Sequence, residues 1–265
     1  MQRGYRFVRC ASCGLVSLTP RPAPAALLAA YADYHARDGG TQASWDRLMR
    51  DVFEESAALL DVAGQPQGSP APRLLDVGCG FGGFVELMRE RGWEAEGLEP
   101  SPAAVETARA RGRPVRPGTL EAFEGRPGGY EAVTLFYVLE HLADPLAALR
   151  KVRTLLAPGG RVVIRVPDTT PIVRLLRPLG LGDWLYDAPF HLFDFSPPTL
   201  RVLLGRTGFT DVRIFPGRPT LPARLSARLT GRAWGALARG LYAGSGGRLL
   251  LPAASKTAIA RKPPR

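Results

Sequence analysis

Four glycines and an acidic residue stand where a short apolar stretch should turn from a strand into a helix. Residues 73–84 read RLLDVGCGFGGF. Glycine permits positive φ and lets the backbone lie against a ligand, while a helix N-terminus presents N–H groups. Asp76 adds a carboxylate at the carboxyl end of the strand, the edge where open α/β sheets bind ligands. We therefore predict a ligand-binding turn whose backbone N–H groups face the ligand.

A second carboxylate is expected beside this turn. Residues 94–98 read as the next strand, and Glu99 ends it. One carboxylate at such a strand tip can accept hydrogen bonds from both hydroxyls of a ribose. Gly78, Gly80 and Gly83 also fit the G-x-G-x-x-G dinucleotide spacing. These residues alone indicate an adenosine cofactor and leave open whether it is a nicotinamide dinucleotide.

Two histidines are candidates for acid–base chemistry. His141 follows an apolar strand and Glu140, and His191 lies in the segment FHLFDFSPP. Imidazole is the side chain that most often transfers protons near neutral pH. We predict that Glu140 and Asp144 organise the loop and the start of the next helix. His141 and His191 are the candidate catalytic residues, with a structural hydrogen bond as the alternative for each.

Alternating strands and helices are predicted to position these groups. The predicted strands are 73–77, 94–98, 114–116, a strand from 130, 161–167, 211–215 and 256–261. Helices are expected at 84–91, 102–112, 146–156, 197–208 and 219–243. Residues 158–160 are predicted to be a turn, and residues 168–190 a loop-rich insertion on the acceptor side. The last two strands are expected to form an antiparallel pair, which a dehydrogenase sheet lacks.

Two motifs resemble a known family. The pattern Asp-x-Gly-x-Gly-x-Gly from Asp76 resembles motif I of the class I S-adenosylmethionine (SAM)-dependent methyltransferases. Residues 135–145, LFYVLEHLADP, look like the motif IV strand and turn of methyltransferases similar to the ubiquinone-pathway O-methyltransferases. The resemblance covers about residues 73–215. It implies a Rossmann-like α/β fold with a seven-stranded sheet and antiparallel last strand pair, a helical N-terminal cap and a helical C-terminal insertion.

The resemblance also implies SAM as the cofactor and a set of contacts to it. An acidic residue beside the glycines suits a ligand that carries a sulfonium and an ammonium. Thr119, in place of the more usual Asp, and Leu120 would contact adenine, and His141 would lie beside the methionine end. The predicted cofactor-binding residues are Asp76, Gly78, Cys79, Gly80, Gly82, Glu99, Pro100, Thr119, Leu120, Tyr137 and Leu139.

The first residues contain a C-x-x-C-G knuckle at Cys10 and Cys13. It resembles the second half of the zinc ribbon of a bacterial methyltransferase group that includes sugar C-methyltransferases. Because structural zinc needs four ligands and one knuckle supplies two, we predict no metal site. In the sugar enzymes the His that matches His191 acts as a base. Residues 188–190, APF, replace their Tyr and Glu before it, which argues against C-methylation here.

Length and composition indicate one α/β domain with appendages. The chain has 265 residues, of which 45% are apolar and 22% charged. We divide it into a partial zinc-ribbon-like knuckle (1–20), a helical cap and linker (21–72) that contains Tyr31 and Tyr34, and a SAM-binding domain (73–265) with an insertion at about 216–253. No apolar run of membrane-spanning length and no signal-peptide core are present in the sequence, which predicts a cytoplasmic protein.

Positive charge is concentrated in the last quarter of the chain. Residues 205–265 hold 12 Lys and Arg and one acid, which accounts for the whole formal charge of +11. The predicted helix there carries an apolar stripe with arginines beside it, formed by Leu221, Leu225, Leu229, Ala233, Arg224, Arg228 and Arg232. It could cover the acceptor or the core, or make peripheral contact with an anionic membrane or sugar phosphate. No aromatic-rich pattern of a nucleic-acid-binding protein accompanies it.

These observations predict a SAM-dependent methyltransferase that acts on an O, N or C atom of a small-molecule, glycan or lipid-like acceptor. One alternative is a catalytically silent SAM-binding protein, which would keep every cofactor residue. The other is an NAD(P)-dependent oxidoreductase, which would share the glycines and Glu99 but has no reason to carry residues 135–145. The sequence predicts no oligomeric state.

Overall fold

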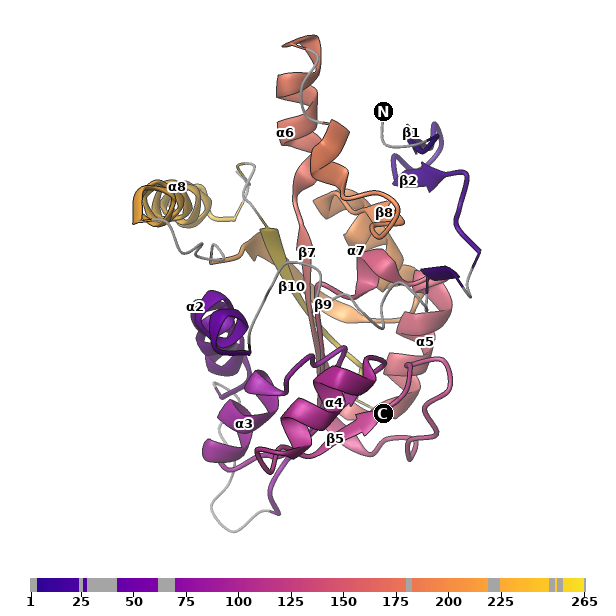
Figure 1. Cartoon of the computed structure of the whole chain (residues 1–265), viewed down its shortest axis with the longest axis vertical. Coiled ribbons are helices and arrows are strands. Elements are labelled where there is room, and N and C mark those ends of the chain that lie inside the picture. Colours follow the sequence, from indigo (N-terminus) through magenta and orange to yellow (C-terminus); the bar gives the residue numbers. More distant parts are fainter. Residues whose placement is uncertain are drawn as a thin grey trace.

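A seven-stranded mixed sheet forms the centre of this computed structural model (Figure 1). The structure describes residues 4–23, 26–27, 42–61, 70–179, 183–218, 225–247, 251 and 255–264, so Tyr31 and Tyr34 lie outside it. The strands are β3 (Arg73–Val77), β4 (Glu94–Glu99), β5 (Val115–Pro117), β6 (Tyr130–Phe136), β7 (Leu156–Pro167), β9 (Thr210–Pro216) and β10 (Ser255–Arg261). Their order is β5-β4-β3-β6-β7-β10-β9.

The closing strands of the sheet confirm the predicted fold class. β5, β4, β3, β6 and β7 are parallel, whereas β10 pairs antiparallel with both β7 and β9. β3 lies between β4 and β6, and Asp76 pairs in register with Gly97 and Thr134. The carboxyl ends of these parallel strands therefore meet at one edge of the sheet, where a ligand is expected.

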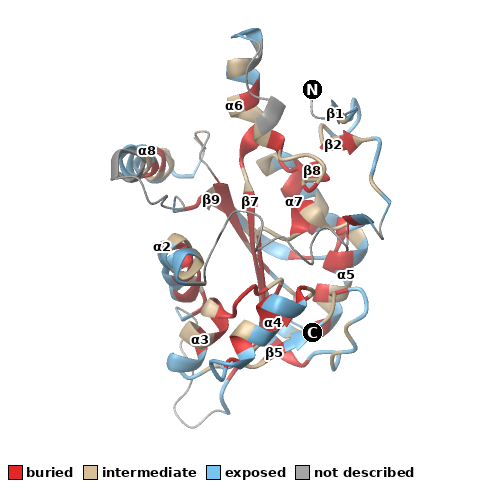
Figure 2. Ribbon diagram, viewed as in Figure 1, coloured by how far each residue is buried: buried red, intermediate tan, exposed pale blue. Residues whose placement is uncertain are grey.

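Helices cover both faces of the sheet. α2 (Gln42–Asp61), α3 (Gly83–Glu90) and α4 (Pro102–Arg109) contribute buried apolar side chains to one cluster, and α5 (Pro145–Leu155) and α7 (Pro197–Arg206) contribute to another. Figure 2 shows that the inward sides of these helices are buried and their outer sides exposed. This amphipathic arrangement makes a three-layer α/β domain.

Capping side chains begin three of the helices at the predicted places. The side chains of Ser101, Asp144 and Ser196 accept hydrogen bonds from the backbone N–H three residues later, and proline occupies the first turn of each helix. Ser, Asp and proline are favoured at these positions because they satisfy or remove unpaired N–H groups. The prediction that Asp144 organises the start of α5 is thus confirmed.

The segment after β7 corrects the sequence interpretation. Residues 168–190 are not mainly loop: they contain α6 (Thr169–Leu176) and the short 3-10 helices η3 (Arg177–Leu179) and η4 (Asp183–Tyr186). The Asp194 carboxylate accepts hydrogen bonds from the N–H groups of Thr169 and Thr170 at the start of α6. Because this cap comes from a residue far along the chain, no local signal marked the helix. β7 also begins earlier than predicted and includes residues 158–160.

Two smaller elements stand outside the main sheet. β1 (Arg6–Arg9) and β2 (Val16–Thr19) form a hairpin that pairs with β8 (Phe193–Asp194) in a three-stranded sheet. α8 (Leu225–Gly244) follows β9 and precedes β10. Within the described part of the chain, no helix has both the length and the apolar character needed to cross a bilayer.

Candidate functional site

A cavity of about 390 Å³ lies at the carboxyl ends of β3, β4, β5 and β6. Several predicted cofactor residues line it, together with the candidate catalytic residue His141: Gly78, Glu99, Pro100, Thr119, Leu120 and Tyr137. Other predicted residues are not among those that line it: Asp76, Cys79, Gly80, Gly82, Leu139 and His191. The lining also includes Leu27 and Trp45, which belong to the segment predicted as a helical cap.

The N–H groups of the glycine turn bond to β4, which corrects the expectation that they face a ligand. The N–H groups of Gly78 and Cys79 both donate to the Leu98 carbonyl, at 2.7 and 3.2 Å. The Gly80 N–H donates to Glu99 Oε2 at 2.9 Å. These donors are therefore used within the fold and do not form a cradle for a diphosphate.

The close approach of the turn to its neighbours explains two of the glycines. Gly78 has a φ of 66°, and a Cβ there would lie 2.5 Å from Val138 Cγ2. Gly97 on β4 faces the Cys79 sulfur so closely that any Cβ would overlap it. Cys79 thus packs the turn against β4 from inside the core, and the missing side chain of Gly78 keeps the cavity wall open.

Asp76 and Glu99 lie on the same face of the sheet and are both nearly inaccessible to solvent. Asp76 Oδ1 accepts a 2.6 Å hydrogen bond from the Thr134 hydroxyl. Burial raises the pKa of Asp76 to about 7, against the opposing effect of that hydrogen bond. Burial also raises the pKa of Glu99, although the N–H groups of Ser101 and Gly80 bond to its two oxygens and oppose the rise. A cationic ligand above this pair would favour both ionised forms.

The opposite end of the cavity is bounded by Tyr137, whose backbone is unusual. Tyr137 has a φ of 57°, rare for a residue with a side chain, and its N–H donates to the Arg165 carbonyl at 2.8 Å. The Arg165 guanidinium is fully buried and donates from Nε to the Tyr137 hydroxyl at 2.9 Å. It also donates to Thr257, Ser255 and the Arg218 carbonyl and lies 3.6 Å from Glu55. Arg165 was not predicted as a site residue, because in RVVIRVP it looks like a polar residue on the exposed side of an ordinary strand.

His141 and His191 come together although fifty positions separate them in the chain. Their ring centroids are 4.8 Å apart, and His141 Nδ1 lies 3.0 Å from the Phe190 carbonyl oxygen. Since a carbonyl only accepts, Nδ1 carries the proton of the neutral ring and Nε2 the lone pair. Burial lowers the pKa of His141 to about 3 and that of His191 to about 4, so both rings are neutral at pH 7.

Glu140 completes this group. Its carboxyl is buried, and neither oxygen has a hydrogen-bond partner among the residues that the structure describes. Burial raises its pKa to about 8, helped by the nearby charge of Asp194 and opposed by Lys256. One donor atom from each of Glu140, His141 and His191 lies within 4.8 Å of the others, a spacing that also suits a cation. The group can therefore hold and pass protons at the cavity wall.

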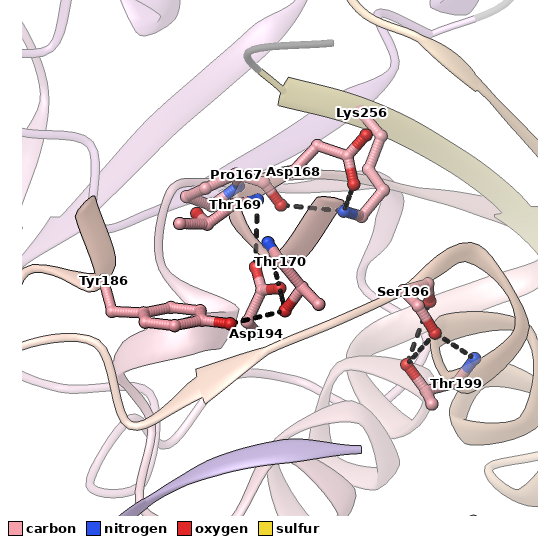
Figure 3. Close-up of polar contacts among 9 residues, drawn as sticks. All are labelled: Pro167, Asp168, Thr169, Thr170, Tyr186, Asp194, Ser196, Thr199 and Lys256. Atoms are coloured by element: carbon pink, nitrogen blue, oxygen red, sulfur yellow. Dashed lines mark hydrogen bonds and ion pairs between the residues drawn. The ribbon is translucent and has the colours of Figure 1, made fainter. Parts of the chain in front are cut away.

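A second polar group includes Asp168, Asp194 and Lys256 (Figure 3). Lys256 Nζ is fully buried and donates to Asp168 Oδ1 at 2.6 Å and to the Pro167 carbonyl at 2.8 Å. Asp194 binds the start of α6 and the Thr170 hydroxyl, which contacts the Tyr186 hydroxyl at 3.0 Å. These bonds join β10 to the end of β7, and β8 to the start of α6.

Cys10 and Cys13 lie far from this site. Both are free and exposed in the turn between β1 and β2. Hydrogen bonds from the backbone and thiol of Cys13 lower the pKa of Cys10. Within the described residues, no third His, Cys, Asp or Glu joins them in a group able to hold a metal ion.

Comparison with known proteins identifies the family of the chain. Residues 45–214 match a family described as a methyltransferase domain, which is more than half of the chain. The chain belongs to this methyltransferase family. A ubiquinone biosynthesis O-methyltransferase of Xanthomonas campestris pv. campestris is 31% identical over 183 residues, covering 65% of this chain and 77% of the relative. The enzyme of that name from Xanthomonas oryzae pv. oryzae is 30% identical over 186 residues, covering 66% and 75%.

Solved structures share the fold of this methyltransferase at low identity. A chain of the complex between the Haloferax volcanii Trm112 methyltransferase activator and a putative methyltransferase has a TM-score of 0.63 at 15% identity, covering 90% of this chain and 98% of that one. Phosphoethanolamine N-methyltransferase 2 of Haemonchus contortus, solved with SAM, has a TM-score of 0.58 at 15% identity, covering 88% and 60%. The protein is therefore a class I SAM-dependent methyltransferase.

The residues of the cavity are compatible with SAM. Glu99 lies at the tip of β4, and the aromatic residues Trp45, Phe136 and Tyr137 are part of the lining, where a ring can interact with a sulfonium. The alternative of an NAD(P)-dependent oxidoreductase is wrong, because the family match identifies a methyltransferase and the turn N–H groups are already bonded. SAM supplies an electrophilic methyl group, and the protein supplies its orientation and a cavity with few polar groups.

Proposed function

We propose that this methyltransferase acts on a hydroxyl oxygen of a small aromatic or lipid-like acceptor. The observation that carries the proposal is the neutral His141 imidazole in the cavity wall, beside Tyr137. An acceptor hydroxyl must lose its proton as its oxygen takes the methyl group, and a neutral imidazole can accept a hydrogen bond from that hydroxyl and hold it in line. The neutral ring of His191, within 4.8 Å, offers the next position for the proton.

The lining of the cavity supports an apolar acceptor. Leu27, Leu142 and Ala143 lie around His141, and Trp45 and Tyr137 provide aromatic surface. A charged sugar nucleotide would lose its hydration here without cationic side chains to replace it, since no Lys or Arg is among the lining residues that the structure describes. The Xanthomonas relatives are named for O-methylation in ubiquinone biosynthesis, which agrees with a hydroxyl acceptor.

The proposed contacts with SAM follow from the same geometry. Glu99 would bind the ribose hydroxyls through the lone pairs that the two N–H donors leave available, and Thr119 and Leu120 would contact adenine. Asp76 would act from beneath the turn through its charge, because its carboxylate bonds to Thr134. Cys79, Gly80, Gly82 and Leu139 would shape the turn without direct contact.

A labelled-methyl assay tests the proposal. The purified protein is incubated with SAM carrying a labelled methyl group and with paired aromatic acceptors that differ only in bearing a hydroxyl or an amine. Transfer to the hydroxyl compounds alone supports O-methylation. Transfer only to amines or to carbon contradicts it, and tight SAM binding without transfer to any acceptor favours the catalytically silent alternative.

Substitutions of residues in the cavity wall test whether the activity depends on the His141 side chain. His141→Gln should lower kcat at least about tenfold while SAM affinity changes little, because a positioned acid–base group contributes about 10²–10⁴ in rate. Leu142→Met, a volume-conserving change in the same wall, is the matched control and should retain activity. Equal loss in both variants would show that packing of the wall, not the imidazole, matters. His191→Asn then tests whether the second ring takes part.

A further inference from the structure

α8 carries an unusual exposed apolar surface. It lies between β9 and β10, outside the residues 45–214 that match the methyltransferase family. Of the eight large apolar side chains that are exposed in the described part of the chain, four lie on α8: Leu229 (59% exposed), Trp234 (47%), Leu237 (50%) and Leu241 (40%). At 3.6 residues per turn, these four fall within an arc of about 140°. They therefore form one continuous apolar face.

The opposite face attaches α8 to the body of the protein. Gly235 and Ala238 are buried, and α8 packs against β9. Figure 1 shows α8 at the margin of the molecule, and Figure 2 shows exposed residues along it. Small residues thus face the protein and large apolar residues face outward, which reverses the usual pattern of a surface helix. An exposed apolar face of this kind marks an interaction surface.

The charge of the region indicates what covers this face. α8 contains three arginines and no Asp or Glu, and the exposed Arg232 lies about 60° outside the apolar arc, one turn from Leu229. Residues 205–265 carry 12 basic residues and one acid, and of the basic residues Lys256 is buried against Asp168. A second copy of the chain would bring like charges together, and a nucleic acid would offer phosphates but no apolar layer for the leucines. The surface of an anionic bilayer provides both negative charge and an apolar layer.

We propose that α8 docks the enzyme on an anionic lipid bilayer. Leu229, Leu237 and Leu241 enter the boundary between headgroups and acyl chains, while Arg232 binds the lipid phosphates. α8 lies in the plane of the interface, with its Gly235 and Ala238 face still on β9. The surface is independent of the identity of the acceptor, so the test uses binding and not methyl transfer.

Vesicle flotation tests the docking. Wild-type protein is mixed with vesicles of phosphatidylcholine alone or of phosphatidylcholine with phosphatidylglycerol. We expect partition onto the anionic vesicles at low salt, with a marked loss at about 1 M salt, where the Debye length is about 3 Å. Arg232→Gln should weaken the partition about fivefold, the effect of one basic residue at an anionic surface.

A matched pair of variants tests the apolar contribution. The triple variant Leu229→Ser, Leu237→Ser and Leu241→Ser should bind anionic vesicles at least about tenfold more weakly. The control is Val202→Ser on α7, since Val202 is 54% exposed but lies on another element, and its binding should equal that of the wild type. Calorimetry with SAM and circular dichroism show whether each variant is folded. If the triple variant is not, Leu237→Ser alone takes its place, with about a twofold or larger loss expected.

Four results would overturn the proposal. The first two are that the wild type does not bind anionic vesicles, or that it binds both vesicle types equally. The other two are that the folded α8 variant binds as strongly as the wild type, or that the α8 and Val202 variants lose binding equally. Light scattering adds a further check. A wild-type dimer that the α8 substitutions convert to a monomer, with vesicle binding unchanged, would assign the face to a second copy of the chain.

Discussion

Replacement of Glu140 by glutamine should stabilise the protein by an amount that grows with pH. Burial raises the pKa of this carboxyl from 4.5 to about 8, so the folded protein keeps a proton that the unfolded chain releases. The free energy of unfolding of the wild type therefore falls as pH rises from about 4.5 to about 8. Glutamine has nearly the same shape and no proton to release, which removes this loss.

The size of the effect follows from the two pKa values. Each unit of pKa difference corresponds to about 1.36 kcal/mol, so the advantage of Glu140→Gln should be about 1 kcal/mol at pH 5, about 3 kcal/mol at pH 7 and about 5 kcal/mol at pH 9. Urea unfolding at these three pH values measures it. Glu106→Gln, the same change at an exposed site on α4, is the control and should show no such trend. A Glu140→Gln advantage that is constant across pH would refute the assignment of a protonated, buried carboxyl.

Three further substitutions test the cofactor turn and the buried ion pair. Gly78→Ala should cost at least about 1 kcal/mol of folding free energy and weaken SAM binding, because the new Cβ would lie against Val138 at positive φ; unchanged calorimetry and urea unfolding would contradict this. Glu99→Gln should raise the Kd for SAM about tenfold or more, with normal affinity as the refuting result. Lys256→Met should cost about 3–5 kcal/mol because Asp168 would stay buried without its cation, and adding Asp168→Asn should recover part of that loss in thermal unfolding.

The sequence predicted the sheet, and about half of the residues that line the cavity at its edge, because these signals are local. The acid–glycine turn, the carboxylate at the tip of the second strand and the Ser-Pro and Asp-Pro helix starts each depend on a few adjacent residues. Glu99, Thr119 and Tyr137 accordingly line the cavity as the motifs indicated. The closing antiparallel strands could be predicted because the two motifs resembled a family with that topology.

Features that depend on distant partners were not predictable in this way. The carboxylate of Asp194 caps the N-terminus of α6. The Cys79 side chain fills the space left by the missing side chain of Gly97 on the neighbouring strand. The use of the turn N–H groups by β4 likewise depends on strand pairing. For α8 the sequence left open whether the apolar stripe covers the protein or contacts a membrane, because periodicity shows that a helix is amphipathic but not which side meets the protein.

Arg165 connects the cavity wall with the chain that leads to α8. Its guanidinium bonds to the hydroxyl of Tyr137 at one end and to the carbonyl of Arg218 at the other. Because α8 packs against β9, which ends two residues before Arg218, a shift of α8 on docking would reach the wall of the cofactor cavity through the Arg165 side chain. Adsorption to a bilayer and binding of SAM would then be thermodynamically linked. If vesicles change the affinity for SAM by some factor, saturating SAM would change the affinity for vesicles by the same factor.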